Sequence, residues 1–418
     1  MSDSPANPAR EPEAVAAGAQ EVPASFTISP APEPSIELGA STDSIAANID
    51  LGVVPTPVAQ TPVQSAPTAA PEKAKAPAAA PNPPSAPAGQ APSPKPTQAQ
   101  ATPPATPATP PTPPKPPEWK KLEPVDPSDP VDHEMKEVWT GPLGWQLIAS
   151  SVRGKLHEHT AKWRDDSYKF DRVDDWTIVA VSDGAGSAAL SRIGAQIACE
   201  EAVKQLKLFL HGYRISPGAD QPPDADLQRI RLFLTNAAGS AKNAIRLEAD
   251  RRKRAINDFH ATLLIVVLTE WQGKDLVAAI QVGDGAIGLK AANGFRVLGI
   301  SDHGDYSSET RFLTTPNIEL EFNNRVCFSI PTGLTALALM TDGVADDFYP
   351  EKTRIGELFE GAPIEGLKTK AGEPLQGLLH GVAKDPRDGE ALRDWLRYEK
   401  RASSDDRTLV LLHRSAQP

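Results

Sequence analysis

The stretch Trp176-Thr-Ile-Val-Ala-Val-Ser182-Asp183-Gly184-Ala185-Gly186-Ser187 decides how the rest of the chain is interpreted. Its apolar run is typical of a buried strand, and the run stops at an acid followed by two glycines. Such a strand can hold the Asp183 carboxylate at its tip, while the glycines let other groups approach the backbone closely. An Asp-Gly pair after a strand is most often only a turn, so this stretch alone does not identify a site.

The same pattern recurs along the chain. Asp284 and Asp342 each follow an apolar run directly, and Asp405-Asp406 precede the last one. Crowded carboxylates raise one another's pKa values unless a cation joins them. Because no His or Cys cluster accompanies these acids, magnesium or manganese is favoured over zinc. The recurrence therefore predicts a shared metal site, in which two ions can activate a water molecule and direct it at phosphorus.

Composition divides the chain into an arm and a globular part. Residues 1–117 contain 29 of the 43 prolines and most of the alanine-rich low-complexity sequence. This stretch cannot bury enough apolar surface to offset the entropy lost on ordering, so we expect a disordered Pro/Ala-rich arm. A charged lead-in segment follows at 118–140, and residues 141–418 are numerous enough to form one large core.

Charge and cysteine usage exclude several classes of protein. The formal charge of −11 argues against a general nucleic-acid binder. Cys199 and Cys327 lie in apolar segments without metal-ligand spacing, as reduced core cysteines do. No run approaches the roughly 20 apolar residues of a membrane span, and the first residues lack a signal sequence. We expect a cytoplasmic, monomeric protein without nucleic-acid or membrane partners.

Hydrophobic periodicity predicts an α+β fold. Asn293-Gly294 predicts a hairpin turn, and Pro331-Thr-Gly333 predicts a second hairpin between its flanking strands. Turns this short exclude parallel crossovers, so we expect antiparallel strands in two sheets. The polar stretch 154–170 is predicted to be a loop. Helices are predicted over 193–206 and 226–254, and strands over 145–152, 176–182, 261–269, 276–282, 286–290, 295–298, 325–330, 334–340 and 407–413.

From about residue 144 to residue 412 the chain resembles the metal-dependent protein phosphatases of the protein phosphatase 2C (PPM) family, particularly their divergent bacterial branch. Five motifs in the expected order carry the resemblance. They are the aspartate-glycine metal motif at 181–187, the Gly-Thr-Thr-like strand at 260–264, the valine-glycine-aspartate motif at 282–285, the aspartate-glycine motif at 340–346 and the closing aspartate motif at 405–410.

The resemblance implies a fold and a set of metal ligands. The fold is a four-layer α/β/β/α sandwich, in which two antiparallel sheets are flanked by helices. Asp183 would bridge two manganese or magnesium ions, with the Gly184 carbonyl on the first ion and Asp342 and Asp405 on the second. Asp284 matches a third metal site of bacterial relatives, although Gly285 stands where they have serine. The implied ligands are Asp166, Asp183, Gly184, Asp284, Asp342 and Asp405.

The resemblance also implies a reaction. A water activated by two bridging metal ions would hydrolyse phosphoserine or phosphothreonine in a protein substrate, without a phosphoenzyme, and so counteract a Ser/Thr kinase. Asp183 and Asp342 would act through the metal ions. His157 combines a ligand-rich loop with a family match and is the candidate general acid. His260 begins an apolar strand and is interpreted as a sheet residue.

One departure from the family leaves alternatives open. Ala161 stands where many relatives have an arginine that grips the phosphate. Arg153, Lys162, Arg164 and His157 are candidates to replace it, and the planar fork of arginine suits two phosphate oxygens best. The alternative is a catalytically weak or inactive phosphatase-like module that binds a phosphoprotein or kinase, and an enzyme for small phosphate esters would share the site chemistry. The complete set of metal acids favours the protein phosphatase.

Overall fold

The computed structural model describes residues 49–50, 119–302 and 310–414. The predicted disordered arm over 1–117 therefore lies outside the described residues except at Ile49 and Asp50, which pair with a strand near the end of the first sheet. Cys199 and Cys327 are free thiols. Among the described helices, none combines the length and the apolar character needed to cross a membrane.

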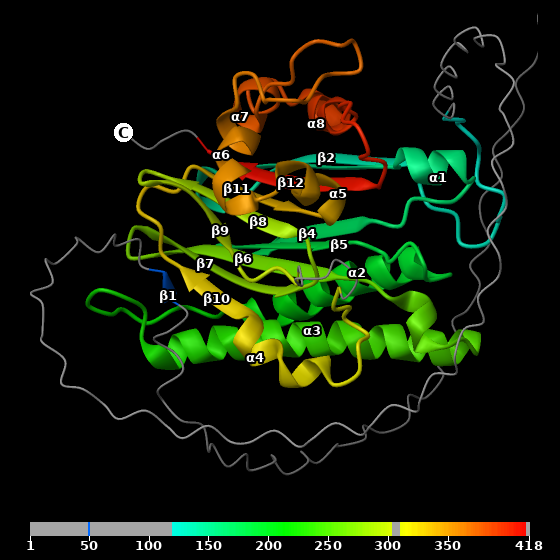
Figure 1. The fold of residues 1–418 in the computed structure, drawn as a ribbon. Helices are drawn as coiled ribbons and strands as arrows, with labels where there is room; N and C mark the ends of the chain where they lie inside the picture. The colour runs from blue at the N-terminus through cyan, green and yellow to red at the C-terminus, as the bar shows by residue number, and fades with distance from the viewer. Residues whose placement is uncertain (1–48, 51–118, 303–309, 415–418) are drawn as a thin grey trace, which may run out of the picture. The chain divides into compact units, whose positions relative to one another are not determined.

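The described residues form two sheets packed face to face, as Figure 1 shows. The first sheet has the order β1-β10-β7-β6-β5-β4 and the second the order β2-β3-β12-β11-β8-β9. All neighbours are antiparallel except β1 and β10, which are parallel. The strands are β1 Ile49–Asp50, β2 Glu134–Thr140, β3 Gln146–Val152, β4 Ser167–Val173, β5 Trp176–Ser182, β6 Leu263–Trp271, β7 Lys274–Val282, β8 Ala286–Ala291, β9 Gly294–Leu298, β10 Val326–Ser329, β11 Ala336–Met340 and β12 Arg407–His413.

Helices cover the outer faces of both sheets (Figure 1). α2 and α3 pack on the first sheet, whereas α6 and α8 pack on the second. The predicted four-layer α+β sandwich is therefore confirmed. The helices are α1 Lys155–His159, α2 Ser191–Leu210, α3 Asp224–Arg252, α4 Phe322–Arg325, α5 Asp342–Ala345, α6 Glu351–Glu360, α7 Leu378–Gly381 and α8 Glu390–Leu396.

The central strands are buried on both faces, which explains their continuous apolar sequences. In β5 every residue is buried, with Val179 and Val181 facing the other sheet and Ile178 and Ala180 facing the helices. A strand between two apolar layers needs no polar face, so alternation disappears from its sequence. α2 is different, because small and apolar residues recur on one stripe against β4 and β5, in keeping with a helix that has one buried face.

The prediction of a hairpin at Pro331-Thr-Gly333 is wrong. β10 pairs with β7 in the first sheet, and β11 pairs with β8 and β12 in the second. The chain between them crosses from one sheet to the other. The turn from β7 to β8 makes a similar crossing, since these strands also belong to different sheets. A short turn keeps two consecutive strands close in space, but they can still belong to different sheets. Because strands buried on both faces are apolar throughout, their sequences do not indicate which sheet they join.

The prediction that 154–170 forms only a loop is also wrong. The segment contains the short helix α1 and the start of β4. β4 forms one edge of the first sheet, and β2, within the predicted charged lead-in segment, forms one edge of the second. Edge strands expose one flank and often carry charged side chains, as the sequence Glu134-Met-Lys-Glu-Val shows. Because β2 and β4 are polar, they lack the apolar runs from which the other strands were predicted.

Candidate metal centre

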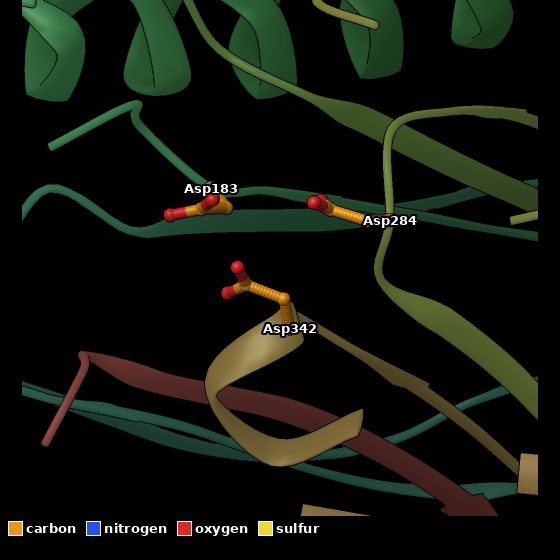
Figure 2. Close-up of side chains that lie close together, drawn as sticks. All are labelled: Asp183, Asp284 and Asp342. Atoms are coloured by element: carbon orange, nitrogen blue, oxygen red, sulfur yellow. The ribbon is translucent and has the colours of Figure 1, made fainter. Parts of the chain in front are cut away.

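Three carboxylates from distant parts of the chain meet at one end of the sandwich. Asp183 follows β5 of the first sheet, Asp342 begins α5 directly after β11 of the second, and Asp284 lies where the chain crosses from β7 to β8. One oxygen from each lies within 4.8 Å of the others. In Figure 2 the side chains of Asp284 and Asp342 point toward Asp183. The crossing between sheets thus brings Asp284 to the other two.

The surroundings of these acids disfavour three negative charges. Burial, followed by the charges of Asp342 and Asp166, raises the pKa of Asp183 well above its ordinary value. Burial, followed by the charge of Asp284, does the same to the pKa of Asp342. Both shifts arise because ionised carboxylates lose hydration and repel one another. A bound cation would remove both penalties.

The donor atoms fit a hard divalent cation. Asp284 Oδ1 and Asp166 Oδ1 are buried and have no hydrogen-bond partner among the described residues. Buried polar atoms are rarely left unpaired, so these two oxygens indicate a missing ligand. The clustered donors are carboxylate oxygens, the type that magnesium and manganese prefer. The residues therefore fit the ions implied by the sequence.

Asp166 lies beside this cluster, anchored by the second sheet. Its Oδ2 accepts hydrogen bonds from Thr341 Oγ1 at 2.9 Å and Thr408 Oγ1 at 2.7 Å. Burial and the charge of Asp406 raise its pKa to about 7. Thr341 precedes Asp342, and Thr408 lies shortly after Asp405 and Asp406. Asp166 is therefore oriented by the same strand ends that carry the other acids. Asp166 is not among the three acids that share the 4.8 Å group.

The two acids before β12 differ in their surroundings. Asp405 is exposed, whereas Asp406 is buried. The Asp406 carboxylate accepts hydrogen bonds from the backbone N–H groups of Gly154 and Asp165, each at 2.6 Å. Asp406 therefore ties the start of β12 to the segment that contains α1. The Asp405 carboxylate accepts a hydrogen bond from the Asp406 N–H at 2.8 Å. The sequence spacing alone does not show which of the two acids is buried.

His157 is enclosed by carboxylates. It is 4% exposed, its Nδ1 lies 2.9 Å from Asp406 Oδ2, and its Nε2 lies 3.7 Å from Asp165 Oδ2. Burial by itself would lower the pKa of His157, but the hydrogen bond and charge of Asp406, with the charge of Asp165, raise it to about 9. Both ring nitrogens face acids of the fold, so the imidazolium is placed to hold Asp406.

We expect His157→Gln to destabilise the protein most at low pH. A pKa raised from 6.5 to about 9 stabilises the fold fully below pH 6.5, and this contribution is lost as pH rises through 9. The shift corresponds to about 3 kcal/mol. Urea unfolding with chelator should therefore show a difference between wild type and variant that shrinks by about this amount between pH 6 and pH 10.

The control for this prediction is His211→Gln, because the His211 side chain is 78% exposed. It should change the free energy of unfolding little at either pH. A difference for His157→Gln that does not vary with pH would show that the imidazole is not charged in the fold.

The candidate phosphate-binding residues have different surroundings. Arg153 and Arg164 are buried, and both donate to backbone carbonyl groups: Arg153 Nη2 to Leu122 and His157, and Arg164 Nε to Asp132. Lys162 is exposed, and its Nζ lies 3.0 Å from the carbonyl oxygen of Gly186, in the loop that follows Asp183. Of the three, Lys162 alone is open to solvent beside that loop.

Thr262 is a site residue without an acidic side chain, so the pattern of acids after apolar runs does not identify it. Its Oγ1 accepts from Asp183 N at 2.8 Å, and its N–H donates to Asp183 O at the same distance. It therefore fixes the backbone of Asp183 from both sides. The signal was present, because Thr262 belongs to the motif at 260–264. His260, by contrast, contacts Thr314 Oγ1 and stacks on Phe312, away from the acids' carboxylates.

The glycines after the acids let the acid-bearing loops pack against one another. A Cβ at Gly184 would lie 2.7 Å from the carbonyl oxygen of Asp165. A Cβ at Gly343 would overlap the carbonyl oxygen of Asp406, and one at Gly285 would overlap that of Met340. Backbone approach of this kind excludes any side chain. The repeated Asp-Gly pattern thus reflects loop packing as well as ligand geometry.

A cavity of about 740 Å³ adjoins Asp405. Its walls come from residues 130–134, from the turn between β3 and α1, and from the segment after α8. Both signs of charge line it, including Lys155, Glu399 and Lys370. Of the candidate metal ligands, Asp405 lines this cavity.

Comparisons with known proteins agree with these features. The sequence model of the family described as protein phosphatase 2C matches residues 153–379, which is more than half of the chain. Serine/threonine-protein phosphatase 3 of Escherichia coli (strain K12) is 22% identical over 183 residues. That match covers 41% of this chain and 64% of the relative.

Solved structures show weaker likeness. A serine-threonine phosphatase 2C from Toxoplasma gondii is 15% identical, with a TM-score of 0.42 over 68% of this chain and all of its own. The catalytic domain of the serine threonine protein phosphatase PstP, solved in complex with two manganese ions, is 15% identical, with a TM-score of 0.37 over 65% of this chain and 98% of its own. Because the family model matches residues 153–379, more than half of the chain, the chain belongs to the protein phosphatase 2C family.

Proposed function

We propose that this protein is a metal-dependent Ser/Thr protein phosphatase that hydrolyses phosphoserine or phosphothreonine in protein substrates. The observation that carries the proposal is the meeting of Asp183, Asp284 and Asp342 within 4.8 Å at one end of the sandwich. A cluster whose charges repel so strongly has no evident structural use, because it destabilises the fold without a cation. Membership of the family supports the same conclusion.

Each acid has a distinct part in the proposal. Asp183, Asp342, Asp405 and the Gly184 carbonyl would together hold two manganese or magnesium ions. Asp284 would serve a third ion, and Asp166 would complete the set of ligands. Bound divalent ions would lower the pKa of a water molecule and offset the charge of the phosphate. The carboxylates would keep these ions fixed while the substrate enters.

The chain's own residues would orient the substrate. Lys162 Nζ reaches the loop after Asp183, so it can meet a phosphate oxygen there. Arg153 and Arg164 are buried and each donates to backbone carbonyl groups, so this proposal assigns them no contact with substrate. His157 would hold Asp406 in place, in preference to the role of general acid. The candidate partner that phosphorylates the substrate is a Ser/Thr kinase.

We expect Lys162→Gln to lower kcat/KM for a phosphothreonine peptide by about tenfold to a hundredfold, mainly through KM. The change removes one charged contact to the phosphate, worth about 1.5–3 kcal/mol. Steady-state kinetics with saturating manganese would measure it. Lys169→Gln is the matched control, since Lys169 is an exposed lysine on β4. Equal kinetics for the two variants would remove Lys162 from the proposal.

The direct test of the function is hydrolysis of phosphoserine and phosphothreonine peptides by the full chain with manganese or magnesium. We expect turnover that a chelator abolishes and added metal restores. Folded protein that binds manganese but hydrolyses no peptide and no small phosphate ester would contradict the proposal. Faster hydrolysis of small esters than of peptides would assign the same site to a metabolite.

The alternative is a phosphatase-like module that binds a phosphoprotein or kinase with little or no catalysis. The observation that favours it is that Ala161 stands where relatives have an arginine, while Arg153 and Arg164 are buried and donate to backbone carbonyl groups. Such a module would bind a phosphopeptide without turnover, and binding would survive Asp183→Asn. Location in the cytoplasm and a monomeric state stay predictions from the sequence.

A further inference from the structure

A segment without helix or strand runs past α1 before the chain enters β2. We call residues 119–133 the strap; it precedes β2 directly. Its side chains at Leu122 and Val125 are exposed, 41% and 82%. Two backbone hydrogen bonds hold the strap to the region of α1: Leu122 N–H donates to Glu158 O at 2.9 Å, and Val125 N–H donates to Ala161 O at 3.2 Å. Both acceptors lie in or next to α1.

Three arginines, each 3–8% exposed, face the carbonyl groups of the strap. Arg153 Nη2 donates to Leu122 O at 2.9 Å, and Arg164 Nε donates to Asp132 O at 3.1 Å. Arg192, at the start of α2, donates to Ser128 O at 2.8 Å and Asp129 O at 3.1 Å. Removing the strap would leave these buried cations short of acceptors, which is strongly unfavourable.

The residues under the strap lead to the acids. Arg153 Nη2 also donates to the His157 carbonyl at 2.8 Å, and the His157 ring contacts the Asp406 carboxylate. Gly154 and Asp165, at the two ends of the same segment, donate their N–H groups to that carboxylate. The strap, segment 153–166 and Asp406 therefore form one continuous network. The two proposed carboxylate ligands outside the 4.8 Å group are Asp166, which ends this segment, and Asp405, which precedes Asp406.

We propose that the strap is a positioning element of the metal centre: by fixing segment 153–166 from outside, it sets where Asp166 and Asp405 lie relative to Asp183. The metal itself rests on the proposed function. Among the described residues no hydrogen bond joins the strap to the clustered acids or to Asp405, so its effect would pass through α1 and Asp406. The strap is therefore part of the catalytic domain, although its sequence looks like a charged linker.

The alternative is a passive anchor, in which the strap only covers buried arginines. The two cases differ in what loosening the strap does to metal affinity. An anchor changes the stability of the whole fold and leaves the assembled site unchanged. A positioning element changes manganese affinity in protein that is still folded, because the ligands must be brought into place when the ion binds.

The test uses backbone-specific substitutions in the full chain. Leu122→Pro with Val125→Pro removes the two N–H donors to α1, since proline has none. Leu122→Ala with Val125→Ala is the matched control, which shortens the same exposed side chains and keeps both donors. Trp163→Phe is a milder variant, which removes only the indole hydrogen bond to Asp126 O at 2.7 Å.

We expect the double proline variant to bind manganese about tenfold more weakly in calorimetry without substrate, and the alanine control to bind like wild type. A tenfold loss corresponds to about 1.4 kcal/mol. Amide exchange of residues 155–162 should accelerate in the proline variant, while exchange in β5 and β6 stays unchanged. Trp163→Phe should shift affinity in the same direction by a smaller factor.

Two results would overturn the proposal. One is wild-type manganese affinity in a folded proline variant whose α1 exchanges faster, and the other is unchanged exchange in α1. If the proline variant does not fold, Trp163→Phe decides by the same affinity measurement. Wild type that binds manganese without hydrolysing phosphopeptides would contradict the proposed function, while weaker binding in the strap variants would still support the positioning role.

Discussion

Asp183→Asn should abolish metal-dependent hydrolysis, with kcat lower by on the order of 10³-fold or more, which corresponds to about 4 kcal/mol of transition-state stabilisation. The substitution removes the charge that two ions would share and leaves an amide, which is a poor bridging ligand. Manganese affinity should fall as well. Without metal the variant should be at least as stable as wild type, because burial, followed by the charges of Asp342 and Asp166, raises the pKa of Asp183. Calorimetry, kinetics and urea unfolding would measure the three effects.

The control for this prediction is Asp175→Asn at the other end of the same strand. Asp175 precedes β5, and its side chain is 62% exposed. Activity and manganese affinity should remain at wild-type values. Full activity of Asp183→Asn would contradict the assignment of the metal centre, whereas lost activity together with an unfolded protein would assign Asp183 a structural role.

Gly343→Ala should destabilise the protein by about 3 kcal/mol and weaken manganese binding at the same time. The added Cβ would overlap the carbonyl oxygen of Asp406, which is backbone and cannot rotate away. Either α5 or the start of β12 must shift, so Asp342 and Asp405 would move apart. Urea unfolding with and without manganese would separate the loss of stability from the loss of affinity.

Gly239→Ala provides a comparison of opposite sign. Gly239 lies within α3, and a Cβ there would meet nothing within 4 Å. Alanine in a helix interior should stabilise the protein by about 0.5–1 kcal/mol, since glycine loses more backbone freedom on folding. Equal stability of Gly343→Ala and wild type would show that the loops after β11 and before β12 have room to separate.

Much of the site was predictable because its signals are local. Each acid of the cluster stands at the end of an apolar run, and β5, β7 and β11 formed where those runs predicted them. A continuous apolar run indicates a buried strand. The Asp-Gly pair at its end indicates a loop that packs closely on another loop. These properties belong to a few consecutive residues, so tertiary structure did not need to be known.

The residues that support the site were harder to find because their partners are distant. Arg153 and Arg164 looked available for a phosphate, yet they bind carbonyl groups of the strap. His157 looked like a general acid, yet its ring is held by Asp406, 249 positions away. The sequence identifies a side chain that can donate a hydrogen bond, and only the fold decides which acceptor it reaches.

The sequence by itself determined the family and the antiparallel α+β class, and it supplied the acids that we propose as metal ligands, because each rests on residue type, local spacing or motif order. Only the tertiary structure decided that β10 and β11 belong to different sheets, that Asp284 lies on the crossing between sheets, and that Asp406 faces inward while Asp405 faces out. The sequence of a strand that is buried on both faces is apolar throughout, so it does not indicate which strands pair with it. Their placement depends on which long-range contacts bury the most surface and satisfy the most hydrogen bonds together.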